Sequence, residues 1–344
     1  MSHSLKQDIS TDVLTSLPPL TLDSGEVIAP LQLSFEAIGP SSAPAVFVMG
    51  GISASRHAGS NEIDTSPGWW EAMVGCGKAL DTRRLRVISM DFVGGNGQSS
   101  GPRNSEGWPR TLTPGDQASA ITMLLDALNI QQLASFVGAS YGGMVALEFG
   151  RRFPERASHL AILGAAHRPP AMATALRCVQ REAVRTCARL GNTAEGLRLS
   201  RAIGMSTYRS DREFDQRFSR EPKAGEPASF EVEDYLFARG HQFAQEFHPD
   251  AYLTLSTSID CLDTRPEDIH TPVSLLAFED DFVAPPSLMR DLHARLSGDS
   301  TLKEISTLFG HDAFLKEVEA VSQWLTEGPL NHQYANLENT ANEN

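Results

Sequence analysis

The chain has 344 residues, of which 43 are acidic and 29 basic, so its formal net charge is −14. With 41% hydrophobic and 21% charged residues it has the composition of a globular protein, which excludes the disordered and fibrous classes. The negative charge argues against nucleic acid or an anionic membrane as a partner. The length suits either one large α/β domain or a core domain with a smaller inserted domain.

The cysteines and the apolar segments indicate a cytoplasmic protein. The N-terminal sequence has no charged region followed by an apolar one, so we expect no signal peptide. No apolar run reaches the ~18 residues that a membrane span needs. The cysteines lack Cys-x-x-Cys spacing, which predicts reduced thiols and no metal site; they are Cys76, Cys178, Cys187 and Cys261.

In chain order, residues 1–18 are expected to be a flexible lead-in. The next two strand-like runs, separated by Ser24-Gly25, predict an antiparallel hairpin at a sheet edge. Helical spacing is found at 117–128, 143–153 and 314–326. The predicted strands are Leu20–Asp23, Leu31–Ala37, Ala45–Met49, Arg86–Phe92, Leu133–Val137, His159–Ala165, Pro272–Phe278 and Leu302–Leu308.

The alternation of strands and helices predicts an α/β fold, with a mostly parallel sheet covered by helices on both faces. Between residues 169 and 264 the strand signals stop and the sequence becomes helical and rich in arginine, which predicts an inserted helical lid. The core domain would then comprise residues 19–168 and 265–328. Residues 329–344 are polar and rich in asparagine, so we expect a flexible tail.

The pentapeptide Gly138-Ala139-Ser140-Tyr141-Gly142 has the pattern Gly-x-Ser-x-Gly between a predicted strand and a predicted helix. A serine at such a sharp turn is held above the sheet, where its hydroxyl can attack a carbonyl. Ser140 also follows a strand at its carboxyl end, the edge at which such sheets bind ligands. These features predict that Ser140 is a catalytic nucleophile.

A serine nucleophile needs a base, and on sheets of this kind the acid and the histidine follow the serine in the chain. His311 lies after the last predicted strand and is therefore the candidate base. The predicted strand ending at Phe278 is followed by three candidate acids, Glu279, Asp280 and Asp281, among which position alone does not choose.

The oxyanion of an acyl-transfer intermediate needs two backbone N–H donors. One is expected from Tyr141, the residue after the nucleophile. The other is expected from the loop Gly50-Gly51-Ile52-Ser53 after an earlier strand, through Ile52.

Taken together, these motifs resemble the MetX-type homoserine O-acyltransferases of the α/β-hydrolase superfamily. The resembling segments span most of residues 45–320. They are Gly68-Trp69-Trp70-Glu71, Gly77-Lys78-Ala79-Leu80-Asp81-Thr82, residues 94–102, residues 138–147, Thr207-Tyr208-Arg209-Ser210, residues 230–236, residues 281–286 and residues 310–315.

The resemblance implies a site and a reaction. It selects Asp281 as the acid, and it matches Arg201 and Asp312 to residues that hold the carboxylate and the amino group of homoserine. It implies ping-pong transfer of an acyl group from acyl-CoA, through an acyl-Ser140 intermediate, to homoserine in methionine biosynthesis. No cofactor is expected to stay bound, and a homodimer is implied. Two alternatives to this function stay open: an acyltransferase whose acceptor is serine, and a plain serine esterase.

The acyl group stays open between succinyl and acetyl, with succinyl slightly favoured. Succinyl needs a second cation near the acyl group, for which Arg56 beside the oxyanion loop is a candidate. Tyr141 departs from the family, in which methionine or leucine usually follows the nucleophile. An arginine stripe on a predicted helix is either a site that attracts the CoA phosphates or a solvated face; its members are Arg177, Arg181, Arg185 and Arg189.

Overall fold

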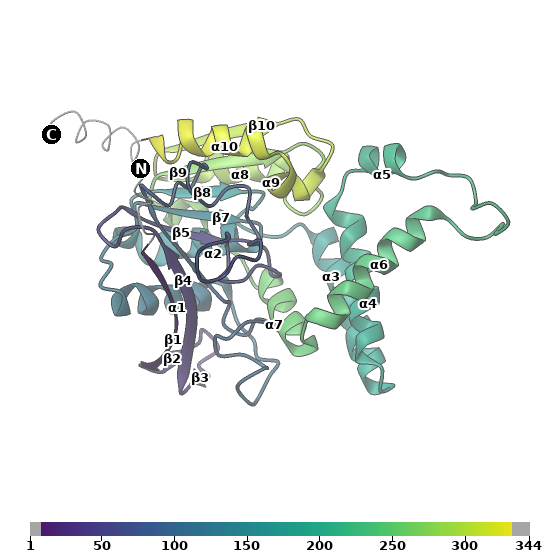
Figure 1. Cartoon of the computed structure of the whole chain (residues 1–344), viewed down its shortest axis with the longest axis horizontal. Helices are drawn as coiled ribbons and strands as arrows, with labels where there is room; N and C mark the ends of the chain where they lie inside the picture. Colours follow the sequence, from purple (N-terminus) through teal and green to yellow (C-terminus); the bar gives the residue numbers. More distant parts are fainter. Residues whose placement is uncertain (1–7, 332–344) are drawn as a thin grey trace.

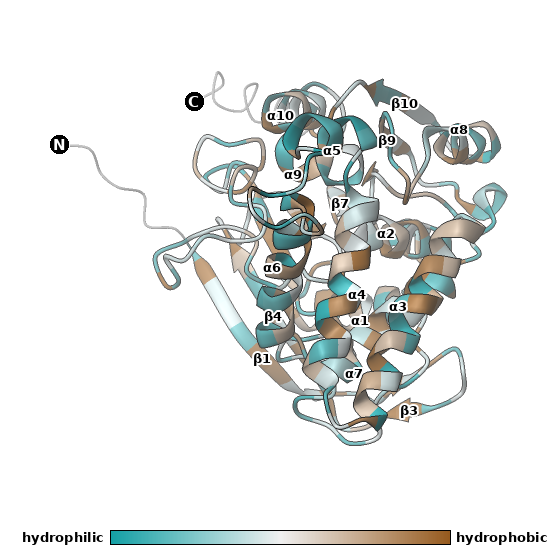
Figure 2. Ribbon diagram, turned by 90° about the vertical axis from the view of Figure 1, so that its right-hand side faces the viewer, coloured by the Kyte–Doolittle hydropathy of each residue, from teal (hydrophilic) through white to brown (hydrophobic). Residues whose placement is uncertain are grey.

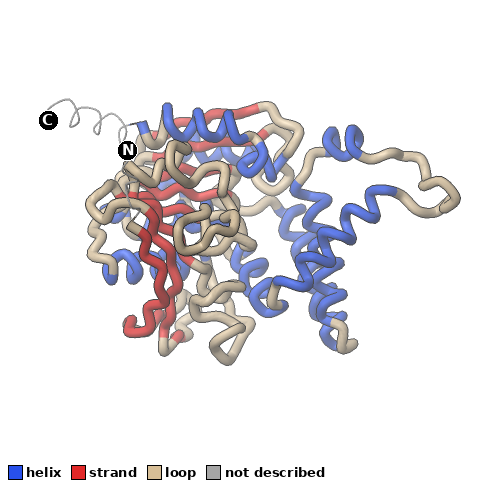
Figure 3. The backbone as a smooth tube through the Cα atoms, in the orientation of Figure 1, coloured by secondary structure: helices blue, strands red, loops and turns tan. Residues whose placement is uncertain are grey.

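The computed structural model describes residues 8–331 and is built around an eight-stranded sheet (Figures 1 and 3). The two antiparallel pairings are β1 with β4 and β4 with β6, and the remaining pairings are parallel. This confirms the predicted α/β fold. In spatial order the strands are β1 (Ile9–Leu17), β4 (Leu31–Ile38), β6 (Arg86–Met90), β5 (Ala45–Met49), β7 (Ser135–Ala139), β8 (Leu160–Leu163), β9 (Val273–Phe278) and β10 (Ser300–Ile305).

The N-terminal segment differs from the prediction. Residues 9–17 form the edge strand β1 instead of a flexible lead-in, and residues 1–7 lie outside the described part. The predicted hairpin is also wrong, because β2 (Leu20–Thr21) pairs with β3 (Val27–Ile28) in a separate ribbon, while β4 pairs with β1. Most β1 side chains are exposed, so this strand depends on backbone pairing and has little hydrophobic pattern.

Apolar side chains alternate between the two faces of the sheet. Phe47 and Met49 of β5 pack in one core with α1 (Pro114–Ala127), α2 (Tyr141–Arg152) and α8 (Pro286–Arg295). Val46 and Val48 pack in the other, with α10 (Val318–Glu327). The single predicted helix at 314–326 is interrupted, since α9 (Ala313–Lys316) precedes α10, and α8 was not predicted.

At the C-terminus the predicted tail begins too early. Leu330 is fully buried in the second core, although it lies within the predicted flexible segment 329–344. A single apolar residue among polar ones gives no periodicity from which to predict packing. Residues 332–344 lie outside the described part.

A helical block, residues 169–264, follows β8. Most of it extends away from the sheet in Figure 1, and it lies on the side that faces the viewer in Figure 2. None of the helices within residues 8–331 is both long and apolar enough to cross a membrane. The helices of the block are α3 (Ala171–Arg189), α4 (Thr193–Tyr208), α5 (Asp211–Arg217), α6 (Glu231–Glu246) and α7 (Pro249–Asp260).

Parallel pairing places the carboxyl ends of β5, β7, β8, β9 and β10 along one edge of the sheet. The loops that follow these strands therefore meet at this edge, which the helical block adjoins. The site described next is built from these loops and from side chains of α3 and α4.

Candidate active site

Ser140 stands at the turn between β7 and α2 in a strained backbone conformation, with φ 55° and ψ −123°. Glycine is required on both sides because the chain passes so close to itself. A Cβ atom on Gly142 would lie 2.1 Å from the carbonyl oxygen of Met49, and one on Gly138 would lie 2.4 Å from that of Gly142. This geometry is the nucleophile turn that the pentapeptide predicts.

His311 and Asp281 meet Ser140 at this edge of the sheet. His311 Nε2 lies 2.8 Å from Ser140 Oγ, and His311 Nδ1 lies 2.8 Å from Asp281 Oδ2. His311 and Asp281 are only 4% and 3% exposed, so bulk water does not compete strongly for these bonds. The Ser–His–Asp chain has the connectivity by which a base activates a serine.

Of the three candidate acids, the structure brings Asp281 alone to His311. Asp281 Oδ1 accepts hydrogen bonds of 2.8 Å from the backbone N–H groups of both Val283 and Ala284, which hold the carboxylate inward. Its neighbours Glu279 and Asp280 point outward and pair with Arg212.

The environment of His311 acts on its pKa in two directions. Burial lowers the pKa because it disfavours the charged ring, while the Asp281 carboxylate raises it through its charge and hydrogen bond. The net effect is a pKa above the ordinary value of 6.5. His311 is therefore a stronger base than a free histidine, which suits proton transfer from a serine hydroxyl.

Two backbone segments that carry the predicted oxyanion donors lie next to the nucleophile. A Cβ atom on Gly51 would lie 3.7 Å from Ser140 Oγ, so the loop after β5 passes beside it, and Ile52 lines the same pocket. Tyr141 is the first residue of α2, where helical N–H groups have no partner within the helix. Within residues 8–331, the N–H groups of Ile52 and Tyr141 have no backbone acceptor.

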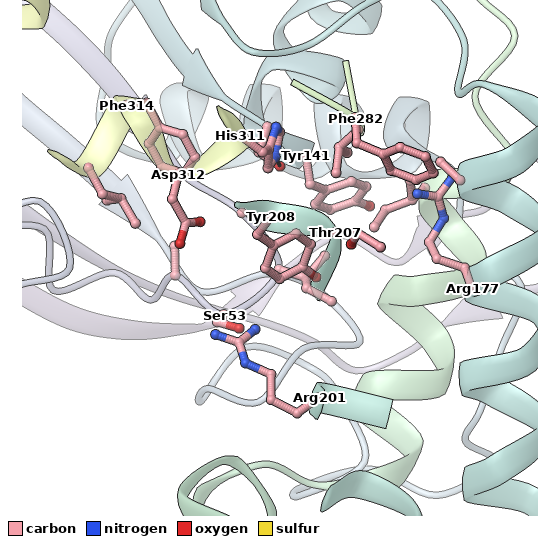
Figure 4. Close-up of a pocket in the computed structure, with 18 of the residues that line it drawn as sticks. Ser53, Tyr141, Arg177, Arg201, Thr207, Tyr208, Phe282, His311, Asp312 and Phe314 are labelled. Carbon is pink, nitrogen blue, oxygen red and sulfur yellow. Dashed lines mark hydrogen bonds between the residues drawn. The ribbon is translucent and has the colours of Figure 1, made fainter. Parts of the chain in front are cut away.

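The two residues matched to an amino-acid substrate lie in the same pocket as Ser140 and His311 (Figure 4). Arg201, on α4, packs with its guanidinium over the Tyr208 and Phe243 rings, at 5.6 and 5.1 Å from their centroids. Within residues 8–331 no carboxylate lies within ion-pair distance of Arg201. A substrate carboxylate would therefore meet an uncompensated cation.

Asp312 stands at the N-cap position of α9, but its side chain makes no capping hydrogen bond. It forms an ion pair with Arg209 instead, with Oδ2 2.8 Å from Nε; the Arg209 side chain is 9% exposed. Sequence reasoning did not assign Arg209 a role, although it lies in the resembling segment Thr207-Tyr208-Arg209-Ser210. Its neighbour Tyr208 also lines the pocket, with its ring centroid 6.0 Å from that of His311.

Tyr141, the atypical residue after the nucleophile, is buried and makes a polar contact with α7. Its hydroxyl lies 2.7 Å from Ser258 Oγ on α7, and its ring packs against Phe92. Burial raises the pKa of the Tyr141 phenol, so it remains protonated at neutral pH. The tyrosine thus connects the nucleophile turn to the last helix of the helical block.

The arginine stripe on α3 divides into two pairs, so neither of its two interpretations describes it as a whole. Arg177 and Arg181 are buried, and both bind the Asp260 carboxylate at 2.6 Å. Arg185 and Arg189 are exposed and pair with Glu182. Only Arg177 of the four lines the Ser140 pocket.

Arg56, the sequence-predicted cation near the acyl group, does not line this pocket. Its guanidinium binds Asp91 at 2.7 Å, and its backbone N–H donates to the same carboxylate. The predicted proximity therefore fails, because Asp91 turns the side chain away from the nucleophile. Within residues 8–331, no group of three His, Cys, Asp or Glu side chains is arranged to hold a metal ion.

Comparisons with known proteins agree with this geometry. A family model described as "alpha/beta hydrolase fold" matches residues 44–318. The chain is 38% identical over 297 residues to a homoserine O-succinyltransferase of Xanthomonas campestris pv. campestris, covering 86% of this chain and 78% of the relative. It is 32% identical over 365 residues to a homoserine O-acetyltransferase of Geobacter metallireducens, covering 95% and 98% respectively.

A solved structure is also similar. The crystal structure of homoserine O-acetyltransferase from Staphylococcus aureus matches with a TM-score of 0.80 and 26% identity, covering 92% of this chain and 94% of that one. Sequence and fold thus agree over nearly the whole chain. The protein belongs to the homoserine O-acyltransferase family of the α/β-hydrolase superfamily.

Proposed function

We propose that this protein transfers an acyl group from acyl-CoA to the hydroxyl of L-homoserine, a step of methionine biosynthesis, through an acyl-Ser140 intermediate. The observation that carries the proposal is that the lining of one pocket includes Ser140, His311, Arg201 and Asp312. A hydrolase needs the first two alone. A paired cation and anion beside them suit an amino acid as the acyl acceptor.

In the first half-reaction His311 Nε2 accepts the Ser140 proton while Oγ attacks the thioester carbonyl. The N–H groups of Ile52 and Tyr141 stabilise the resulting oxyanion. As the intermediate collapses, the carbon–sulfur bond breaks and the CoA thiolate leaves with the proton from His311. The products are an acyl-Ser140 ester and free CoA.

In the second half-reaction homoserine occupies the space that CoA has left. Arg201 binds its carboxylate and Asp312 its ammonium group, which places the hydroxyl against the ester. His311 takes the hydroxyl proton, the homoserine oxygen attacks the acyl carbon, and the bond to Ser140 Oγ breaks as that oxygen recovers the proton. The ion pair with Arg209 fixes the position of the Asp312 carboxylate beside the pocket.

Acyl-CoA as the donor is supported by a second hollow that adjoins the pocket and shares Arg201 and Asp312 with it. Three further basic side chains line this hollow: Arg209, Arg239 and Lys316. Arg209 is already paired with Asp312 and Glu213, and Glu71 also lines the hollow. In a protein with a net charge of −14, Arg239 and Lys316 are therefore the cations that suit the phosphates of CoA. Succinyl is favoured over acetyl, since the succinyltransferase relative is 38% identical and the acetyltransferase 32%.

A CoA-release assay that crosses succinyl-CoA and acetyl-CoA with homoserine and serine tests the proposal. We expect release to depend on homoserine, and mass spectrometry of the enzyme with acyl-CoA alone to detect acyl-Ser140. Arg201→Met should raise the KM for homoserine more than the KM for acyl-CoA, since Arg201 would bind the homoserine carboxylate directly but is one of several cations in the hollow proposed for CoA. The exposed Arg185→Met is a matched control. Release that is independent of the acceptor would indicate an esterase, and a preference for serine would reassign the acceptor.

We also propose a homodimer. Large apolar side chains are exposed on two helices of the helical block: Met172 and Val179 on α3 and Phe237 on α6 are 62%, 57% and 41% exposed. A second copy that covered them would remove this surface from water. Light scattering after size exclusion should give twice the 37.4 kDa chain mass, and Val179→Glu should lower it. A monomer at micromolar concentration would contradict the proposal.

A further inference from the structure

Arg177 brings a second cation to the Ser140 pocket. In Figure 4 its side chain reaches from α3 toward Phe282, on the other side of Thr207 and Tyr208 from Arg201. We infer that Arg177 binds a carboxylate at the far end of the acyl group, so that the pocket selects dicarboxylic acyl donors of the succinyl type. The inference rests on the proposed transfer through Ser140 and assigns the residue that chooses the donor.

Among residues 8–331, the ion pairs of Arg177 leave an excess of positive charge around it. Arg177 and Arg181 share the single carboxylate of Asp260, with Nη2 of the first and Nη1 of the second each 2.6 Å from one of its oxygens. The three side chains are only 10%, 8% and 11% exposed. Two guanidinium groups against one carboxylate leave one positive charge in excess, and a buried charge without a partner is costly. A ligand carboxylate would compensate this charge.

The hydrogen bonds of Arg177 leave one nitrogen available. Nε and Nη2 both donate to Asp260 Oδ1, at 2.8 and 2.6 Å, and Nη2 also lies 3.3 Å from Thr174 Oγ1. Within residues 8–331, Nη1 has no hydrogen-bond partner. Arg181 is held differently, since its Nη1 also donates to the Ser256 carbonyl oxygen and it does not line the pocket. Arg181 and Asp260 therefore fix Arg177, while Arg177 itself reaches the ligand space.

The pocket wall near Arg177 suits the two methylene groups of a succinyl chain. Its lining residues are apolar on three elements: Ala173 and Leu176 on α3, Ile259 on α7, and Phe282 and Val283 after β9. The apolar wall would contact the methylene groups of a succinyl group, and the guanidinium beside it would bind the terminal carboxylate. An acetyl group would reach neither and would leave the excess charge buried.

Arg177 and Arg201 would thus have separate substrates. The acyl group stays on Ser140 while CoA leaves and homoserine enters, so the acyl carboxylate and the acceptor carboxylate are present together. Two carboxylates bound by one cation would repel each other. Separate cations, on α3 and α4, avoid this repulsion.

The test compares two esters of equal chain length, 4-nitrophenyl hydrogen succinate and 4-nitrophenyl butyrate, in stopped-flow acylation of the full-length enzyme. We expect wild type to prefer the succinate ester. Arg177→Met should lower kcat/KM for this ester by about 10- to 100-fold, the range for loss of one hydrogen bond between charged groups, and should change the butyrate rate by less than about threefold. Arg185→Met, on the same helix but exposed, should leave both rates unchanged.

Equal losses on both esters in a folded Arg177→Met enzyme, or a wild type without preference for succinate, would overturn the inference. If Arg177→Met does not fold in a thermal melt, Arg177→Lys decides, because it keeps the charge. The Arg177→Lys enzyme should retain part of the preference for the succinate ester. Loss of this preference in Arg177→Lys would also overturn the inference. These assays need neither CoA nor homoserine, so failure of the proposed acceptor would appear separately, as CoA release that ignores homoserine.

Discussion

Replacing Asp281 by asparagine should nearly abolish catalysis, and the structure indicates how. Asp281 Oδ1 accepts two backbone N–H groups, from Val283 and Ala284, each at 2.8 Å. An asparagine must keep its carbonyl oxygen there, since its NH2 group would otherwise face two donors. The NH2 group then points at His311 Nδ1, which has to accept a hydrogen bond instead of donating one.

The change of hydrogen bond reverses the tautomer of His311. The ring proton moves to Nε2, 2.8 Å from Ser140 Oγ, where an acceptor is needed to take the serine proton. Loss of the correct tautomer lowers kcat by about 10⁴-fold in a Ser–His–Asp system, which corresponds to about 5 kcal/mol of transition-state stabilisation. We expect a loss of this size in kcat for homoserine-dependent CoA release. The thermal unfolding transition of the variant should remain cooperative.

The adjacent Asp280→Asn is the matched control. Asp280 is 45% exposed and pairs with Arg212 at the surface, so we expect kcat to change by less than about twofold. The reasoning would be refuted if the Asp281→Asn variant kept more than a tenth of the activity. It would also be refuted if Asp280→Asn lost as much activity as Asp281→Asn.

Three further predictions follow from the same site. The acid limb of kcat/KM should have its midpoint above pH 6.5, because only the neutral His311 ring accepts the serine proton. Burial lowers the pKa of His311, but the Asp281 carboxylate raises it to a net value above 6.5. A midpoint below pH 6 in a pH–rate profile would contradict this. Tyr141→Phe should lower the free energy of unfolding in urea by about 1 kcal/mol, because buried Ser258 loses its partner, and should leave kcat within about threefold; collapse of kcat at unchanged stability would give the hydroxyl a role in the reaction. Gly142→Ala should cost about 1–3 kcal/mol and most activity, because its Cβ would lie 2.1 Å from the Met49 oxygen, and an unchanged melting temperature would refute this steric argument.

The parts of the site that could be predicted from sequence are those fixed by local structure. Ser140 lies in a strand–turn–helix segment with the recognisable local pattern Gly-x-Ser-x-Gly, and His311 follows the last strand. Of the two glycines, Gly138 is required by a local contact with Gly142, whereas Gly142 is required by the distant Met49. The acid could not be chosen from its position, because three carboxylates follow β9. The choice depends on which side chain the turn directs inward, and the N–H groups of Val283 and Ala284 decide it.

Long-range pairing explains why the cations were misassigned. The four-residue spacing on α3 predicts one continuous stripe, yet Asp260, far along the chain on α7, binds the first two arginines and leaves the others at the surface. Arg56 is next to the oxyanion loop in sequence, but Asp91 binds it. Periodicity and adjacency contain no information about a partner that folding brings from another segment.

The contacts of α7 bear on how this enzyme could be re-engineered. Ser258 meets the nucleophile turn through Tyr141, Leu255 packs in the core of the sheet, and Asp260 anchors Arg177. A graft that exchanged residues 169–264 as a unit would therefore disturb the catalytic turn, whereas one that ended before Pro249 would separate Arg177 from its anchor. Donor specificity should thus be transplantable only with α3, α7 and residue 141 from the same parent.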